Sequence, residues 1–419
     1  MRLKNKINLS SYIKDILTSL TGTTLSQLIT ICMAPILTRI YQPADYGLLG
    51  VYMSITAILF VFVNFQYSQA ILLTESKEEE DNVVLLCFST SVIFSLLIGL
   101  IILIFHFFEF SFFTSAKLKY WLFFIPVSIF LNSGNTILSK VLNKYKRYKG
   151  LSFSLVVAAI TTVSCSLGFG LIYHSYEGLF VGFLMGQFSR LLILYIYSRK
   201  YKIERCNINK KAILNGIKKY KKFPLFSIPT EFLYGWTDQL PIYFFNTYAS
   251  TTVIGHFNYG KRMVSLPITL VTGAVGRVFS QKAAEHYNNT GECKKVFMDT
   301  LKMLAFPILP FFVILGIFAP DIFGFVFGNK WITAGEYVQI LLPMFYLKAV
   351  VSPLSYMFII KGKQDEDMIL HIVSFVLVAF SFYLGYLLKS EVNTTLSFFS
   401  FSYCLIYIYT LIRSYQFSK

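Results

Sequence analysis

A small set of ionisable side chains lies deep inside long apolar stretches of this 419-residue chain. A charge at membrane depth is costly, so such groups usually face a cavity or a partner of opposite sign. The carboxylates are Glu231 and Asp238, and the cations are Lys261, Arg262 and Lys348. Clustered cations suit an anionic ligand such as a diphosphate, because fixed charges in a low-dielectric cavity replace part of its hydration. A carboxylate among them would also serve as a titratable group that binds and releases a proton.

Asp238 and Arg262 are expected at one depth. They lie twelve residues before and twelve residues after Ser250, where two apolar stretches turn as a hairpin. At 1.5 Å per residue each would lie ~18 Å from the turn, near the middle of the bilayer. Two interpretations stay open: the two charges neutralise each other as a structural ion pair, or they line a hydrated cavity. Lys348, eleven residues into a later stretch, is expected at a similar depth.

Two further cations, Arg39 and Arg277, lie nearer to the ends of their stretches. Long basic side chains there commonly reach the polar interface, so anchoring is the alternative to a role in a cavity. We expect no bound metal, because the five histidines have no Cys or His at ligand spacing. We also expect no catalytic residue and no cofactor. The predicted substrate-contacting residues are Arg39, Lys261, Arg262, Arg277 and Lys348, and the candidates for coupling to H⁺ or Na⁺ are Asp238 and Glu231.

Twelve apolar stretches position these residues, each near the roughly 20 residues that a helix needs to cross a bilayer. The stretches are 17–40, 47–72, 83–108, 120–141, 151–173, 178–198, 223–248, 252–280, 297–319, 337–360, 368–388 and 394–413. The lysines and arginines outside them gather at the amino terminus and in the even-numbered connections, above all in 144–149 and 199–222. Because basic residues near helix ends stay in the cytoplasm, both termini and the long linker are expected on that side.

One connection resists this charge pattern, because residues 74–82 hold five carboxylates and a single lysine. Acidic residues contribute little to orientation, so the predicted topology is unchanged. The net charge of +17 would suit a nucleic-acid partner, but the basic residues lie at helix ends, where they contact anionic lipid headgroups. Charged residues make up only 14% of the chain, against roughly 25% in soluble domains. The class is therefore an integral membrane protein with no nucleic-acid partner.

The basic linker divides the chain into six stretches and six stretches that look alike. The turn into the second stretch reaches Gly47, and the turn into the eighth reaches Gly255, 208 residues later. Duplication of six helices gives halves of like orientation, related by an axis along the membrane normal, with a substrate cavity between them. The predicted domains are an N-terminal six-helix bundle at 1–200, a cytoplasmic linker at 201–222 and a C-terminal six-helix bundle at 223–419.

Residues 255–261 (GHFNYGK) match most of a phosphate-binding loop, but Arg262 replaces the hydroxyl residue and no strand precedes them. The amides of an apolar helix are already hydrogen-bonded and cannot hold phosphates. No nucleotide partner is expected.

Several short segments are similar to one family. In the second half they are 223–229 (FPLFSIP), 239–241 (QLP), 265–267 (SLP), 278–284 (VFSQKAA), 318–320 (FAP) and 325–328 (FVFG). In the first half they are 21–24 (TGTT), 35–41 (PILTRIY) and 45–47 (DYG). These segments resemble the Wzx-like O-antigen and polysaccharide repeat-unit flippases, the polysaccharide transporter branch of the multidrug/oligosaccharidyl-lipid/polysaccharide exporter superfamily. The resemblance covers the first eighty residues and about 223–363, and rests elsewhere on hydropathy alone.

The resemblance implies an all-α integral membrane fold of about twelve transmembrane helices. Its two six-helix bundles, related by pseudo-two-fold symmetry, would form a V around a central cavity. The implied task is to move an undecaprenyl-diphosphate-linked oligosaccharide, a repeat unit of O-antigen, capsule or a related polysaccharide, from the cytoplasmic to the periplasmic leaflet by alternating access. The implied location is the bacterial inner membrane, with membrane lipids and the polysaccharide polymerase machinery as further partners.

Related flippases couple to a cation gradient, and in some of them a cation lies between the seventh, eleventh and twelfth helices. Here the seventh stretch supplies Asp238, but the last two hold no buried carboxylate, only His371 near one end and several hydroxyl residues. That departure argues against a sodium site. It leaves proton coupling through Asp238 or Glu231 as the expectation.

Two other classes stay open. A polysaccharide polymerase or ligase is also polytopic, but such enzymes present a large periplasmic loop, and the longest outward connections here, near 109–119 and 320–336, have fewer than twenty residues. A small-molecule exporter of the same superfamily would share the fold, but mainly basic cavity candidates do not suit cationic drugs. We expect a transporter and not an enzyme.

Overall fold

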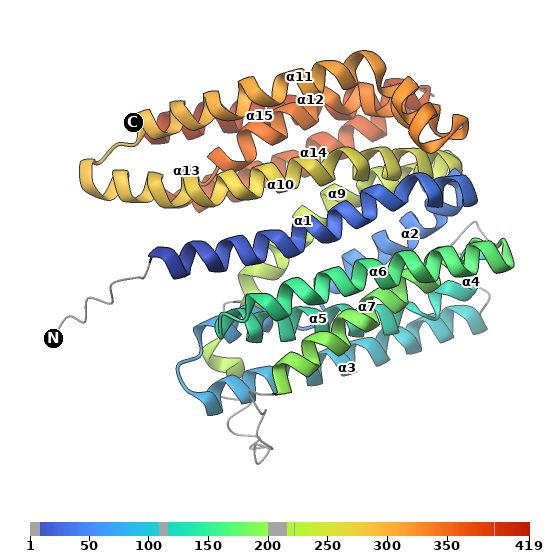
Figure 1. Cartoon of the computed structure of the whole chain (residues 1–419), viewed down its shortest axis with the longest axis horizontal. Coiled ribbons are helices and arrows are strands. Elements are labelled where there is room, and N and C mark those ends of the chain that lie inside the picture. Colours follow the sequence, from blue (N-terminus) through green and yellow to red (C-terminus); the bar gives the residue numbers. More distant parts are fainter. Residues whose placement is uncertain (1–8, 109–115, 200–215, 222, 389) are drawn as a thin grey trace. The chain divides into compact units, whose positions relative to one another are not determined.

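The computed structural model describes residues 9–108, 116–199, 216–221, 223–388 and 390–419 (Figure 1). The described chain is helical almost throughout. Its elements are α1 (Leu9–Ile40), α2 (Pro43–Phe60), η1 (Tyr67–Leu73), α3 (Lys77–Phe107), α4 (Ala116–Leu122), α5 (Ile125–Lys144), α6 (Tyr148–Tyr173), α7 (Glu177–Ser198), η3 (Phe223–Ser227), α9 (Ile228–Tyr248), α10 (Thr251–Thr290), α11 (Lys294–Phe327), η4 (Asn329–Trp331), α12 (Ile332–Leu354), α13 (Met357–Ile360), α14 (Gln364–Leu387) and α15 (Val392–Ser418).

Ten helical segments of the described chain are long and apolar enough to cross a membrane. The helices α5 and α9 fall outside that set but have comparable lengths of 20 and 21 residues, and with them the number reaches the predicted twelve. Outward faces of these helices are apolar: on α3, Ile93 and Leu96 are 64% and 69% exposed. Apolar surface of this extent needs apolar surroundings. The predicted all-α, multi-pass membrane fold is confirmed.

The chain divides into two compact units, which are described separately. Unit 1 comprises Met1–Ile40 and Tyr52–Phe232, and unit 2 comprises Tyr41–Val51 and Leu233–Lys419. In unit 1, α6 packs against α1 and α7, and α5 packs against α3 and α7. In unit 2, α12 packs against α10, α11 and α15, and the segment that contains it is the most buried of the ten. The bundle boundaries predicted from the basic linker stay a prediction.

A tight hairpin connects α9 to α10, at the place that the sequence predicts. The Ser250 hydroxyl accepts a hydrogen bond from the Val253 amide at 3.3 Å, and so caps the first turn of α10. This turn fixes the register between the two helices that carry Asp238 and Lys261. Depth along one helix can therefore be compared with depth along the other.

The start of α2 and the start of α10 cross within unit 2 at two glycines. A Cβ atom added to Gly47 would lie 1.8 Å from the carbonyl oxygen of Thr251, and one added to Gly255 would lie 1.8 Å from that of Pro43. The same 208 residues separate Pro43 from Thr251 and Gly47 from Gly255, so the contact is reciprocal, as in a two-fold related pair. The internal repeat predicted from these glycines has a structural counterpart at this crossing.

Candidate functional site

Unit 2 contains a cavity of about 280 Å³ whose walls come from α9, α10, α12, α14 and α15. The walls combine apolar and hydroxyl side chains with a few charged groups, a composition typical of ligand sites. The titratable side chains in the lining are Tyr234, Asp238, Lys261, Lys348, Asp367, His371, Tyr403 and Tyr407.

An ion pair between Asp238 of α9 and Lys261 of α10 lies on the cavity wall. The Lys261 Nζ donates to Oδ1 of Asp238 at 2.6 Å and lies 3.3 Å from the backbone oxygen of the same residue. The Asp238 side chain is 44% exposed and the Lys261 side chain 19% exposed. The pair is therefore accessible from the cavity and not sealed inside the packed core.

A second ammonium group, from Lys348 of α12, faces the same carboxylate. Lys348 interacts electrostatically with Asp238 and with Lys261, and the described residues give it no ion pair of its own. Two cations thus share one carboxylate at this wall. Such an arrangement attracts a further anion, because like charges at close range in a cavity repel each other.

At the predicted depth, the partner of Asp238 is Lys261 and not Arg262. Successive residues of a helix point about 100° apart around its axis, so a correct depth does not fix which side chain faces the neighbour. Lys261 faces α9, whereas Arg262 is exposed and lies outside the cavity lining. Of the two interpretations of Asp238 and Arg262, the structural ion pair is therefore wrong, because Asp238 is bonded to Lys261.

The remaining predicted site residues lie elsewhere. Arg39 is exposed in the last turn of α1, and Glu231 is exposed in the first turn of α9, both in unit 1. Arg277 is exposed in unit 2 and lines a groove of about 490 Å³ that adjoins the cavity. Cavity and groove share Ser352, Ser355 and Asp367. The structure therefore brings together Asp238, Lys261 and Lys348 of the predicted set.

Two titratable residues of α14, Asp367 and His371, line the cavity but were not among the predicted site residues. The predicted stretch began at residue 368, but α14 begins at Gln364 and brings Asp367 into the cavity lining. The His371 Nε2 lies 3.9 Å from Oδ2 of Asp367. Three successive carboxylates at 365–367 are a helix-start signal, and they would have placed the boundary correctly.

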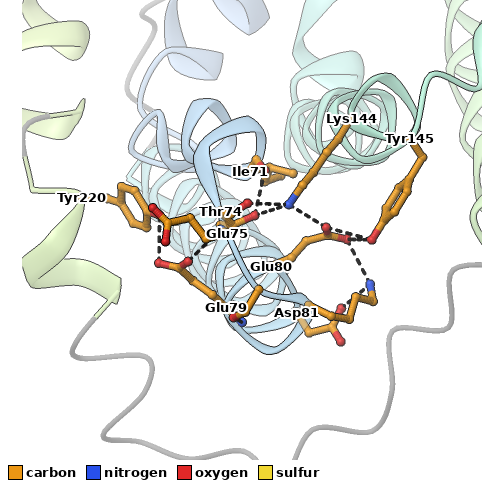
Figure 2. Close-up of polar contacts among 11 residues, drawn as sticks. Ile71, Thr74, Glu75, Glu79, Glu80, Asp81, Lys144, Tyr145 and Tyr220 are labelled. Atoms are coloured by element: carbon orange, nitrogen blue, oxygen red, sulfur yellow. Dashed lines mark hydrogen bonds and ion pairs between the residues drawn. The ribbon is translucent and has the colours of Figure 1, made fainter. Parts of the chain in front are cut away.

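The acidic segment that resisted the charge pattern forms an ion-pair cluster in unit 1 (Figure 2). Ser76 caps α3 by accepting a hydrogen bond from the Glu79 amide. The Glu80 side chain is only 2% exposed and pairs with the Lys144 Nζ at 2.9 Å. It also accepts hydrogen bonds from Lys77 at 3.0 Å and from the Tyr145 hydroxyl at 3.0 Å. Burial and the neighbouring carboxylate raise the pKa of Tyr145.

The same cluster holds the end of the basic linker. Glu79 pairs with Lys219 and accepts a hydrogen bond from the Tyr220 hydroxyl at 2.9 Å. The Tyr220 ring is buried in an apolar cluster with Ile71 and Val84. The carboxylates of the acidic segment thus neutralise lysines that are remote in sequence, which is a structural role within unit 1.

The fold is shared with solved structures of other membrane proteins. It resembles the structure titled lipid II flippase MurJ in an inward closed conformation, with a TM-score of 0.75 and 16% identity over 96% of this chain and 90% of the other. It also resembles an inward-facing multidrug resistance MATE family transporter of the MOP superfamily, with a TM-score of 0.68 and 15% identity over 94% of this chain and 93% of the other. Identities this low establish the shared fold alone.

The family described as polysaccharide biosynthesis protein matches residues 36–336, and the chain belongs to it. A curated relative is the teichuronic acid biosynthesis protein TuaB of Bacillus subtilis (strain 168), 21% identical over 152 residues. That match spans 36% of this chain and about a third, 32%, of the relative.

Proposed function

We propose that the protein is a flippase for undecaprenyl-diphosphate-linked oligosaccharide repeat units. It moves them from the cytoplasmic to the periplasmic leaflet by alternating access, for the synthesis of O-antigen, capsule or a related polysaccharide. Membership of the polysaccharide biosynthesis family supports the substrate class. The fold shared with a lipid II flippase supports the mode of action.

The observation that carries the proposal is the pair of ammonium groups that share one carboxylate in the cavity of unit 2. A lipid-linked sugar carries its charge in a diphosphate, and this charge opposes passage through hydrocarbon. Lys261 and Lys348 would contact the diphosphate, and Asp238 would serve as the counter-ion that it displaces. A cationic drug would be repelled by the ammonium groups of Lys261 and Lys348, which disfavours a multidrug exporter.

Asp238 is also the proposed coupling residue. When the diphosphate binds Lys261, it displaces Asp238 as the ion-pair partner of that lysine. The carboxylate then has no cation bonded to it and lies beside a negative charge, and both changes favour its protonated form. Substrate and proton would then occupy neighbouring groups. Coupling by H⁺ needs no further ligands, whereas a sodium ion would compete with the Lys261 ammonium for the same oxygen.

The proposed setting is the bacterial inner membrane, with both termini and the 199–222 linker in the cytoplasm and the polymerase machinery as a partner. Single cysteines introduced into a cysteine-free variant test this topology. A membrane-impermeant maleimide added from outside should label a cysteine at Ser250 and leave one at Asn209, which lies outside the described residues, unlabelled. The opposite result would overturn the orientation.

Accumulation of repeat units in a deletion strain tests the function. If the protein is a flippase, the deletion strain should lose the polymer and retain lipid-linked units in the cytoplasmic leaflet. The intact gene should restore the polymer. Loss of polymer with single units still reaching the periplasm would contradict the proposal and indicate a polymerase or ligase.

A further inference from the structure

The cavity of unit 2 has one histidine in its described lining, His371 of α14. Its Nε2 lies 3.9 Å from Oδ2 of Asp367, one helical turn away. Its ring meets the Tyr234 ring edge to face, with the centroids 5.7 Å apart. Tyr234 precedes Asp238 by one turn of α9, and residues at that spacing share a helix face. The imidazole therefore belongs to the same polar wall as the Asp238–Lys261 pair.

The other charges of the lining balance. Two carboxylates, Asp238 and Asp367, accompany two ammonium groups, Lys261 and Lys348. The remaining titratable groups that α9 and α15 contribute are the phenols of Tyr234, Tyr403 and Tyr407, and phenols are neutral near pH 7.

An imidazole is the side chain that ordinarily changes its charge between about pH 5 and 8. Protonation of His371 thus decides whether the wall is neutral or carries one excess positive charge. Asp367 is the carboxylate next to the imidazole, with Oδ2 3.9 Å from Nε2. Asp367 also borders the adjoining groove, which Asp238 does not line.

We propose that His371 links anion binding in this cavity to proton uptake. The inference rests on the proposed function, because the anion concerned is the diphosphate headgroup. A protonated imidazole attracts the anion, and by thermodynamic reciprocity the bound anion stabilises the proton. Affinity for a diphosphate therefore rises as the pH falls through the range in which the imidazole titrates.

Binding of farnesyl diphosphate to the purified full-length chain in detergent tests the link. The dissociation constant is measured at about pH 6 and about pH 8. The dissociation constant should be lower at the acidic pH than at the alkaline pH. This ratio should be larger in the wild type than in H371Q by a factor on the order of ten. The probe's own protonation is common to both proteins and cancels from this comparison.

Three further variants make the outcome specific. H286Q removes an exposed histidine at the end of α10, outside the cavity lining, and should behave as wild type. H371K supplies a permanent charge and should bind tightly at both pH values. D367N removes the carboxylate beside the imidazole and should alter the ratio of the two dissociation constants, whereas H286Q should not.

Equal pH ratios in wild type and H371Q would overturn the inference while leaving the diphosphate site intact. Weak binding by H371K at both pH values would overturn it as well, because the charge would then not be the cause. No binding by wild type at either pH would contradict the proposed diphosphate site itself.

Discussion

At the scale of single residues, three charged groups interact at one wall of the cavity: Asp238, Lys261 and Lys348. Two roles of the Asp238 carboxylate, structural counter-ion and coupling group, predict different responses to substitution. As a structural counter-ion it would only neutralise Lys261, to which it is bonded at 2.6 Å. As a coupling group it must also bind and release a proton during transport.

A double-variant cycle separates these roles. If Asp238 carries the coupling proton, the double variant D238N/K261Q stays inactive even though neither charge is left unpaired. If the pair is only structural, the double variant should regain much of what each single change loses, because each single change leaves one charge without its partner. Transport in the three variants is measured at matched membrane levels. Regained activity in the double variant would remove Asp238 as the proton carrier and Lys261 as an essential contact of the diphosphate.

Lys348 and Arg262 provide a matched test of the cavity assignment. Lys348 lines the cavity beside Asp238, whereas Arg262 is exposed outside the lining. K348A should therefore reduce complementation at least tenfold, the loss of one charge-assisted contact of about 1.5–3 kcal/mol. R262A should retain most of it. Equal loss of complementation in both variants, with both proteins present in the membrane, would contradict the assignment of the substrate site to the cavity of unit 2.

At the scale of elements, the acidic first turn of α3 anchors two other segments of unit 1. Glu80 is the buried member, bonded to Lys77, Lys144 and Tyr145, and Glu78 is an exposed member of the same turn. E80Q should lower the free energy of unfolding by about 1–3 kcal/mol, because three donors lose a buried, charged acceptor. E78Q should change it by less than about 0.5 kcal/mol.

Unfolding of the purified variants in detergent measures the difference. Unfolding midpoints that coincide for E80Q and E78Q would mean that the cluster contributes no stability.

The existence and order of the helices could be predicted from the sequence because a bilayer demands about 20 apolar residues per crossing. The hairpin at Ser250 and the depth of Asp238 followed from the same periodic rise. The facing partner could not be predicted, since Lys261 and Arg262 differ by one position and only packing decides which points at α9. The structural role of residues 74–82 could not be predicted either, because their lysine partners Lys144 and Lys219 lie about 65 and 140 residues away in the chain.

At the scale of the whole molecule, the reciprocal crossing of Gly47 and Gly255 relates the two halves of the sequence. Within unit 2 there is no room for a side chain at either glycine. G47A should cost about 1–3 kcal/mol, the usual penalty for an overpacked contact. G273A is the matched control, because a Cβ atom there meets nothing within 4 Å, and helix propensity predicts a gain of about 0.5–1 kcal/mol.

The two glycine variants can be compared by unfolding in detergent and by complementation. A G47A protein as stable and as active as G273A would contradict the close crossing of α2 and α10.

The most direct test of the central claim is reconstitution of the purified chain into liposomes that hold an undecaprenyl-diphosphate-linked oligosaccharide in both leaflets. A membrane-impermeant glycosidase outside first cleaves the units in the outer leaflet, and later cleavage then reports movement from the inner one. A flippase predicts that wild-type protein exposes the protected units far faster than protein-free liposomes, and that K348A largely abolishes this movement. Protected units that stay protected, with folded wild-type protein in the bilayer and a proton gradient imposed in either direction, would contradict a flippase.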